Sequence, residues 1–263
     1  MLLAHLSDTH ISSGSLERTV NYSAVKAVER VRALHPPPDC TIVTGDLVET
    51  GTPDEYATSR CLLDQLAGPV HVVPGNHDNP TVMLSELSGT SYVQRAPAEP
   101  DRCYYRVDLP ELRLLCCDSN VAGRHHGRLG NTQLRWLDDE LGRGDETPTV
   151  IALHHHPVRS DIAAMDEIML ADAAEFAGVL ARHQPVVRIL HGHLHRPMTG
   201  LLARAVVMSA PSTDRQVHLD LDPDGPGAFI QEPPGIMLHR LNGNDDVSHL
   251  IPVRNPGPLV NSF

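Results

Sequence analysis

Short apolar runs that alternate with helical patterns constrain the fold of this chain most strongly. Seven runs of four to six residues are rich in Val, Ile or Leu, which is typical of buried strands. These runs are Leu2–Leu6, Thr41–Thr44, Val70–Val73, Leu112–Cys117, Val150–Leu153, Val186–Leu190 and Ala205–Ser209. Patterns with a single apolar stripe predict helices over Leu16–Leu34, Asp54–Ala67, Asn131–Leu141 and Ala171–His183. The alternation of strands and helices predicts a layered α/β fold.

Five of the apolar runs end directly in Asp, Asn or His. The segments that follow them read SDTH, GDLVE, PGNHD, HHHP and HGHLH. Binding sites of α/β sheets form at the carboxyl ends of the strands, so we expect these polar side chains to converge at one edge. Each motif alone is a weak signal, but five such endings in one chain predict a metal site.

Each motif also has a simpler structural explanation. Asp8 and His10 are two residues apart and can face one metal, although a D-T-H sequence also forms helix N-cap turns. Asp46 follows a glycine, and a Gly-Asp pair often forms nothing more than a turn. The Asn and Asp of Gly75–Asp78 also favour turns, yet Asn76 and the following His lie where a metal and a phosphate could meet.

The histidines that follow Val150–Leu153 and Val186–Leu190 can reach a site only if their side chains lie on the correct face of the chain. Neighbouring strand residues point to opposite faces, so only some of His154–His156 can reach a site, and the others lie behind it or at the surface. In the segment LHGHLHRP, His191, His193 and His195 occupy alternate positions and share one face if the segment is extended. The G-H-x-H pattern of His193 and His195 is the strongest single motif, because histidine is the commonest metal ligand.

Charge and cysteine content narrow the functional classes. The net charge is -12 and Lys26 is the only lysine, which disfavours binding to a nucleic acid polymer or to an anionic membrane surface. No apolar run reaches the ~18 residues of a membrane span, and the N-terminal residues lack the features of a signal peptide. The five cysteines are odd in number and irregularly spaced, so we expect free thiols and a cytoplasmic location.

The composition of the chain changes after residue 213. Residues 222–235 are rich in Pro and Gly and predict an irregular loop between two strands, Gln216–Leu221 and Gly235–Leu241. A last strand over Val247–Val253 could close the sheet. We therefore expect a catalytic core over residues 1–213, and C-terminal strands with a Pro/Gly-rich cap loop over residues 214–263 that complete the same domain.

The five motifs, in their order, resemble those of the calcineurin-like metallophosphoesterases. The matching residues are Asp8-Thr9-His10, Gly45-Asp46, Gly75-Asn76-His77-Asp78, His154 and Gly192-His193-Leu194-His195. The segments LLAHLSDTHI, VVPGNHD, ALHHHPV and GRHHGRLGNTQLRWLDDEL look like the bacterial class III cyclic-nucleotide phosphodiesterases and related glycerophosphodiesterases, over roughly residues 1–215. The resemblance implies a four-layer αββα sandwich of two mixed sheets flanked by helices.

The resemblance also implies a dinuclear metal centre. One metal would take Asp8, His10, Asp46 and His195, and the other Asp46, Asn76, His154 and His193, so that Asp46 bridges the two. The nitrogen and oxygen ligands suit Fe, Mn, Zn or Co and do not choose among them. In such enzymes a metal-bridging hydroxide attacks the phosphorus.

The remaining roles follow from the same resemblance. Asp46 and His77 would be catalytic, and His77 either donates a proton to the leaving oxygen or only positions the phosphate. The side chains expected to contact the substrate are His10, Asn76, His77, His126 and His195. His125 and His126 lie in a loop that can equally be a solvated one, Asp78 would orient the turn or a ligating His, and His191 would pack behind the site.

Several functions remain open on the sequence. We expect hydrolysis of a small phosphodiester, with 3′,5′-cyclic AMP converted to 5′-AMP as the leading reaction. A glycerophosphodiesterase or broad-specificity phosphodiesterase is the alternative, followed by a protein phosphatase or nuclease and, least favoured, a non-catalytic scaffold. The substrate-discriminating residues would lie around residues 122–130 and 214–234, and the second segment could form a lid or a homodimer contact.

Overall fold

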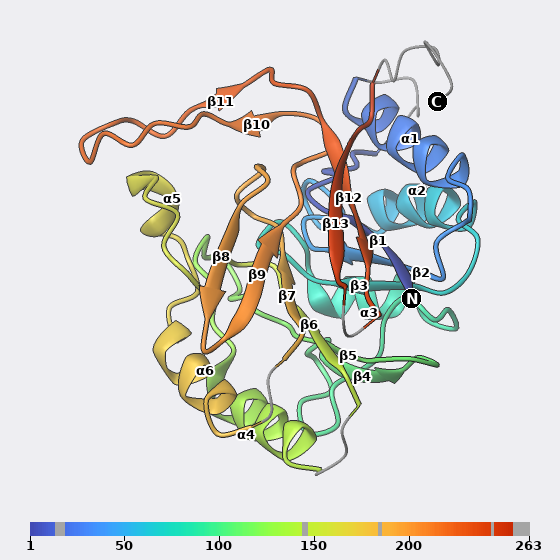
Figure 1. Cartoon of the computed structure of the whole chain (residues 1–263). Helices are drawn as coiled ribbons and strands as arrows, with labels where there is room; N and C mark the ends of the chain where they lie inside the picture. Colours follow the sequence, from blue (N-terminus) through green and yellow to red (C-terminus); the bar gives the residue numbers. More distant parts are fainter. Residues whose placement is uncertain (14–18, 144–146, 184–185, 243–244, 255–263) are drawn as a thin grey trace.

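Two β-sheets pack face to face in the computed structural model, with helices on both outer sides (Figure 1). The structure describes residues 1–13, 19–143, 147–183, 186–242 and 245–254. This arrangement confirms the expected αββα sandwich. The first three residues of the helix predicted over Leu16–Leu34, and the end of the C-terminal segment from residue 255, lie outside the described residues.

The first sheet has the strand order β13-β12-β1-β2-β3. Its strands are β1 (Leu2–Leu6), β2 (Cys40–Thr44), β3 (Val70–Val73), β12 (Gly235–Arg240) and β13 (Val247–Pro252). Strands β1 to β3 are parallel, whereas β12 pairs antiparallel with both β1 and β13. The C-terminal strands are therefore hydrogen-bonded to the N-terminal strand and form one edge of its sheet.

The second sheet has the strand order β4-β5-β6-β7-β9-β8. Its strands are β4 (Tyr105–Asp108), β5 (Arg113–Cys116), β6 (Thr149–Ala152), β7 (Arg188–His191), β8 (Thr199–Leu202) and β9 (Ala205–Ser209). The four central strands are parallel, and the edge strands β4 and β8 are antiparallel to their neighbours. Neither edge strand was expected from the sequence, because an edge strand contributes fewer buried residues and lacks a continuous apolar run.

Helices cover the outer faces of both sheets (Figure 1). The helices are α1 (Thr19–Arg32), α2 (Pro53–Leu63), α3 (Pro80–Glu86), α4 (Gly130–Leu141), α5 (Ala163–Asp166) and α6 (Ala173–Leu180). The short α5 does not cover a sheet, since its Met165 packs with Leu194 and Val217. The four longer helices lie within or beside the predicted helical ranges. The short helices α3 and α5 were not predicted, since seven and four residues are too few to show a helical period.

Alternate residues of the second sheet face two different cores. Leu114, Val150 and Leu190 pack toward the first sheet, whereas Leu115, Ile151 and Ile189 pack under α4 and α6. All of these side chains are fully buried. A strand that is buried on both faces needs apolar residues at every position, which explains the continuous apolar runs of the sequence.

The Pro/Gly-rich segment forms an arm that extends away from the two sheets (Figure 1). The strand predicted over Gln216–Leu221 is only β10 (Gln216–Val217), and it pairs with β11 (Phe229–Ile230). The prediction of an irregular loop was thus wrong at β11, because two of its residues pair with β10 and local periodicity does not reveal this pairing. No helix among the described residues has the length and hydrophobicity needed to cross a membrane.

Candidate metal centre

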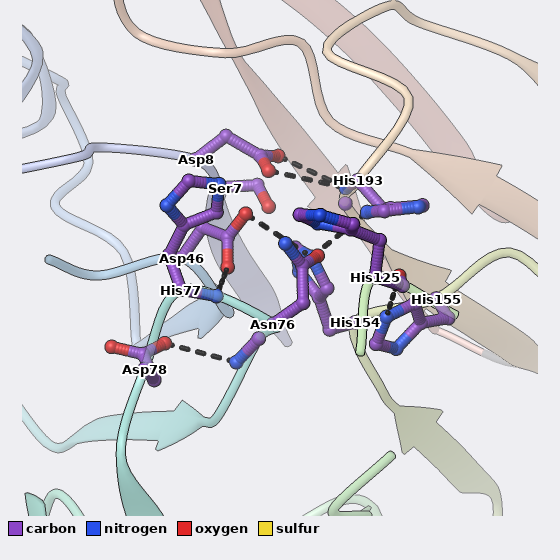
Figure 2. Close-up of polar contacts among 12 residues, drawn as sticks. Ser7, Asp8, Asp46, Asn76, His77, Asp78, His125, His154, His155 and His193 are labelled. Carbon is purple, nitrogen blue, oxygen red and sulfur yellow. Dashed lines mark hydrogen bonds and ion pairs between the residues drawn. The ribbon is translucent and has the colours of Figure 1, made fainter. Parts of the chain in front are cut away.

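The polar residues that follow the strands meet where the two sheets approach each other (Figure 2). Asp8, Asp46 and Asn76 come from the loops after β1, β2 and β3 of the first sheet. His154 and His193 come from the loops after β6 and β7 of the second sheet. The sequence expectation of convergence is correct, because all five strands are parallel within their sheets and end at the same edge.

Four buried side chains form a first cluster whose possible ligand atoms all lie within 4.8 Å of one another: Asp8, His10, Asp46 and His195. His195 Nε2 lies 3.2 Å from Asp8 Oδ1 and 3.2 Å from His10 Nε2. His10 Nε2 lies 3.8 Å from Asp46 Oδ2. Two ligand atoms at a metal–nitrogen distance of ~2.1 Å are about 3.0–3.4 Å apart, so this spacing fits a bound metal.

A second cluster shares Asp46 with the first. His154 Nε2 lies 3.4 Å from Asp46 Oδ2, 3.1 Å from Asn76 Oδ1 and 3.2 Å from His193 Nδ1. The other ring nitrogen of His193 is buried and has no hydrogen-bond partner within the described structure. The same carboxylate oxygen therefore faces both clusters, which is the arrangement expected of a bridging ligand.

The three consecutive histidines have different roles, although all of them are fully buried. His154 Nδ1 donates to the carbonyl of Thr44 at 2.8 Å, which leaves Nε2 for the cluster. His155 is within metal-ligand range of His154 and His193. However, its Nε2 lies 3.0 Å from the carbonyl of His125 (Figure 2). Its Nδ1 lies 2.8 Å from Ser119 Oγ, so both ring nitrogens are engaged.

His156 and His191 lie behind the clusters. His156 Nε2 is 3.6 Å from Asp166 Oδ1, and its ring lies 6.3 Å from that of His191. His191 is the last residue of β7 and is fully buried. Of the two positions expected for the histidines that do not reach the site, His156 takes the one behind it and none of the three lies at the surface.

Backbone strain is concentrated in the site. Eight non-glycine residues of the described chain have a positive φ, and five belong to the two clusters: Asp8, His10, Asp46, His193 and His195. Such conformations cost of order 1–3 kcal/mol each and persist only where the surroundings enforce them. At Gly192 a Cβ would collide with Ser7 Oγ, Asp8 Oδ2 and the carbonyl of Thr44, so the glycine permits the close approach of the two sheets.

Electrostatics favour a cation in this site. Burial tends to raise the pKa of Asp46, but His154 and His10 beside it hold that pKa well below its ordinary value. Burial tends to lower the pKa of His154, yet Asp46 and Asp8 raise it to about 9. Burial together with His155 and His154 keeps the pKa of His193 far below its ordinary value. Metals bind ionised carboxylates and neutral imidazoles, so at His154 a metal ion would replace the proton that Asp46 and Asp8 hold there.

The turn Gly75–Asp78 presents Asn76 and His77 beside the clusters. The backbone N–H of His77 donates to Asp46 Oδ1 at 2.8 Å, and its ring stands edge-on to His10 with centroids 4.8 Å apart. Asp78 Oδ2 accepts from the backbone N–H groups of Gly75 at 2.9 Å and Leu47 at 3.1 Å. Asp78 thus orients the turn, which was one of its two expected roles.

Sequence reasoning missed Glu49, although the motif GDLVE contains it. Glu49 Oε2 lies 2.8 Å from His10 Nδ1, and its backbone carbonyl lies 2.8 Å from His77 Nδ1. The pKa of Glu49 is lowered chiefly by its hydrogen bond to His10. A carboxylate behind a metal-binding histidine fixes the ring orientation and increases the basicity of the ligand. Only the three-residue spacing from Asp46 could have hinted at this role.

A pocket of about 600 Å³ adjoins the second cluster. It is lined by Thr50, Asn76, His77, Asp78, Asn79, Pro80, Thr81, Asp101, Arg102, Asp118, Asn120, Val121, Ala122, Gly123, Arg128 and Gly130. The loop around residues 122–130 therefore contributes as expected, whereas residues 214–234 do not line it. His126 is not among the lining residues, so the structure does not place this predicted substrate contact in the pocket.

Comparison with known proteins agrees with the geometry. The profile of the Calcineurin-like phosphoesterase family matches residues 1–197. The chain is 32% identical over 256 residues to a glycerophosphodiester phosphodiesterase of Enterobacter lignolyticus, covering 95% of this chain and 90% of the relative. It is 37% identical over 238 residues to a probable cyclic nucleotide phosphodiesterase of Rhodococcus erythropolis, covering 85% and 74%.

The fold has a counterpart among solved structures. A dimetal phosphatase of Danio rerio superposes with a TM-score of 0.71 over 96% of both chains, at 17% sequence identity. At that identity the likeness concerns the fold alone. The family profile covers most of the chain, including all five motifs, and the relatives named above are phosphodiesterases. This chain therefore belongs to the calcineurin-like phosphoesterase family and is a metal-dependent phosphodiesterase.

Proposed function

We propose that this protein hydrolyses small phosphodiesters at a centre of two transition-metal ions. Asp8, His10, Asp46 and His195 would bind one ion, and Asp46, Asn76, His154 and His193 the other. The observation that carries this assignment is the position of Asp46 Oδ2, 3.8 Å from His10 Nε2 and 3.4 Å from His154 Nε2. One carboxylate oxygen is thus within reach of both ions.

The ligand set suits the reaction. Nitrogen and oxygen donors without a thiolate favour Fe, Mn, Zn or Co. Bound there, two such ions supply a nucleophile at neutral pH and neutralise charge on the phosphoryl oxygens. Asp8 and Asp46 contribute two negative charges against at least four positive ones, so the centre attracts a phosphodiester anion although the whole chain is acidic.

His77 is the residue that we assign to the leaving oxygen. Its Nδ1 faces the carbonyl of Glu49, which only accepts hydrogen bonds, so Nδ1 carries a proton. Nε2 is then the nitrogen that remains for the substrate. We propose that His77 in its imidazolium form donates a proton from Nε2 to the departing alkoxide, whereas a neutral His77 only positions the phosphate.

We propose 3′,5′-cyclic AMP as the first substrate to test, with 5′-AMP as the product. A pocket of about 600 Å³ beside the second cluster is within the ~300–1,000 Å³ range of small-molecule sites. Relatives named for cyclic nucleotides and for glycerophosphodiesters both support a small diester. The second candidate is a glycerophosphodiester, because hydroxyl, amide and charged side chains line the pocket. His77 is the one lining residue with an aromatic ring, which also favours a substrate without a base.

A substrate panel tests the proposal. The purified protein is stripped of metal, reloaded with Mn, Fe, Zn or Co, and assayed on cyclic AMP, cyclic GMP, a 2′,3′-cyclic nucleotide, a glycerophosphodiester and an aryl phosphodiester. We expect metal-dependent hydrolysis of at least one diester, with cyclic AMP preferred. Absence of hydrolysis of every diester with every metal would refute the enzymatic assignment and favour a scaffold.

We also propose a homodimer and a cytoplasmic location. The arm exposes Leu219, Leu221 and Phe229 by 52%, 61% and 57%, which is a large apolar area for an isolated pair of short strands. A second copy would cover it, and sedimentation velocity of the full chain tests this. All five cysteines are free thiols and four of them are buried, which supports a reducing compartment.

A further inference from the structure

The amide of Asn120 links the two halves of the candidate site. Asn120 follows β5 of the second sheet, whereas the turn Gly75–Asp78 follows β3 of the first sheet. Asn120 Nδ2 donates to the backbone carbonyl of Gly75 at 2.5 Å and to that of Asp78 at 3.1 Å. These two carbonyls are the first and last of the turn, so one side chain holds both ends of it.

The two central residues of the turn that Asn120 holds belong to the candidate site. They are Asn76, whose Oδ1 lies 3.1 Å from His154 Nε2, and His77, whose backbone N–H donates to Asp46. A Cβ at Gly75 would collide with the backbone and carboxylate of Asp46, so the turn already packs directly on the shared carboxylate. A small shift of this turn therefore moves Asn76 relative to the histidines of the second sheet.

Asn120 is itself held rigidly by a buried carboxylate. Asp118 is fully buried, and its Oδ1 accepts from the backbone N–H of Asn120 at 2.9 Å. Its Oδ2 accepts from the backbone N–H of Cys103 at 3.0 Å and lies 3.3 Å from Arg102 Nε. The backbone of Asp118 exchanges two hydrogen bonds with the side chain of Gln133 on α4. The clamp is thus anchored to the second sheet and to its covering helix.

The first sheet holds the same turn from the opposite side. Asp78 accepts hydrogen bonds from the backbone N–H groups of Leu47 and Gly75, and Tyr56 Oη donates to Asp78 Oδ1 at 3.1 Å. None of these partners belongs to the second sheet. Among the hydrogen bonds of the described structure that reach the turn's backbone, those of Asn120 are therefore the ones that set its distance from the second sheet, which carries His154 and His193.

We propose that Asn120 is a positioning residue that sets the distance of Asn76 and His77 from the second sheet. This inference rests on the proposed two-metal function. Because Asn76, on this turn, is a ligand of the second metal only, loosening the clamp weakens that metal selectively. The first metal keeps its ligands, since none of them lies on this turn.

The variants Asn120→Ala and Asn120→Asp test the inference. Both remove the two N–H donors, and Asp additionally places a carboxylate against two carbonyl oxygens. We expect about 10- to 100-fold weaker binding of the second Zn²⁺ or Mn²⁺ in a calorimetric titration, with the first unchanged. At low metal concentration kcat should fall in parallel, and excess metal should restore a large part of it. Asn131→Ala, at an exposed asparagine of α4, is the matched control.

The outcomes separate this inference from the proposed function. If both variants bind two metals as tightly as the wild type, the clamp has no positioning role, even if the melting temperature falls. If metal binding weakens equally at both positions, the effect is general destabilisation and the inference is equally refuted. If the wild type binds fewer than two metals or hydrolyses no diester, the proposed function fails instead.

Discussion

Replacing Glu49 with Gln should weaken the first metal without unfolding the protein. The change keeps the size of the side chain but removes the negative charge that lies 2.8 Å from His10 Nδ1. Hydrogen bonds to charged groups contribute about 1.5–3 kcal/mol. Because the Glu49 side chain is 37% exposed, solvent screening reduces this to the lower end of the range. A loss of about 1.4 kcal/mol corresponds to roughly tenfold weaker binding.

The assay is a titration of metal-free protein with Zn²⁺ or Mn²⁺ that resolves the two binding events. Only the site that contains His10 should weaken, since the second cluster has no contact with the Glu49 carboxylate. Glu29→Gln is the matched control, because Glu29 is an exposed carboxylate on α1 that pairs with Lys26. Equal affinities of wild type and Glu49→Gln at both sites would show that the carboxylate does not support His10, and the argument from geometry would be wrong.

Three further predictions follow from the site and its surroundings. Metal analysis should show that His193→Ala and His195→Ala each lose one metal and that His191→Ala keeps both; loss of metal from the last variant would contradict the assigned register. His77→Gln should slow alkyl diesters at least tenfold more than an aryl diester in steady-state assays, and equal losses would mean that His77 only positions phosphate. Burial lowers the pKa of His71 to about 4, so unfolded chains take up a proton that the folded protein excludes, and stability falls as the pH drops from about 6.5 toward 4. Denaturant unfolding should show that His71→Leu removes up to about 1.4 kcal/mol per pH unit of this dependence, and an unchanged slope would refute it.

The sequence patterns alone predicted a layered α/β fold and a metal site at the strand ends, whereas the four layers and the two ligand sets came from the resemblance to a known family. Continuous apolar runs identify strands that are buried on both faces, and the residue type directly after each run identifies the edge where the site forms. The G-H-x-H register predicted metal binding by His193 and His195 and not by His191, and in the structure the first two belong to the clusters whereas His191 is buried outside them. These features are local, because they depend on residues that are neighbours in the chain.

Tertiary structure decided the features that depend on distances between remote segments. Only the packing of the two sheets shows that one oxygen of Asp46 faces both clusters, or that both nitrogens of His155 are engaged and unavailable to a metal. Glu49 and Asn120 carry no motif of their own, and their roles arise from contacts with His10 and with the turn of Asn76. Periodicity specifies which face a residue occupies, but the partner that it meets there depends on how the whole chain folds.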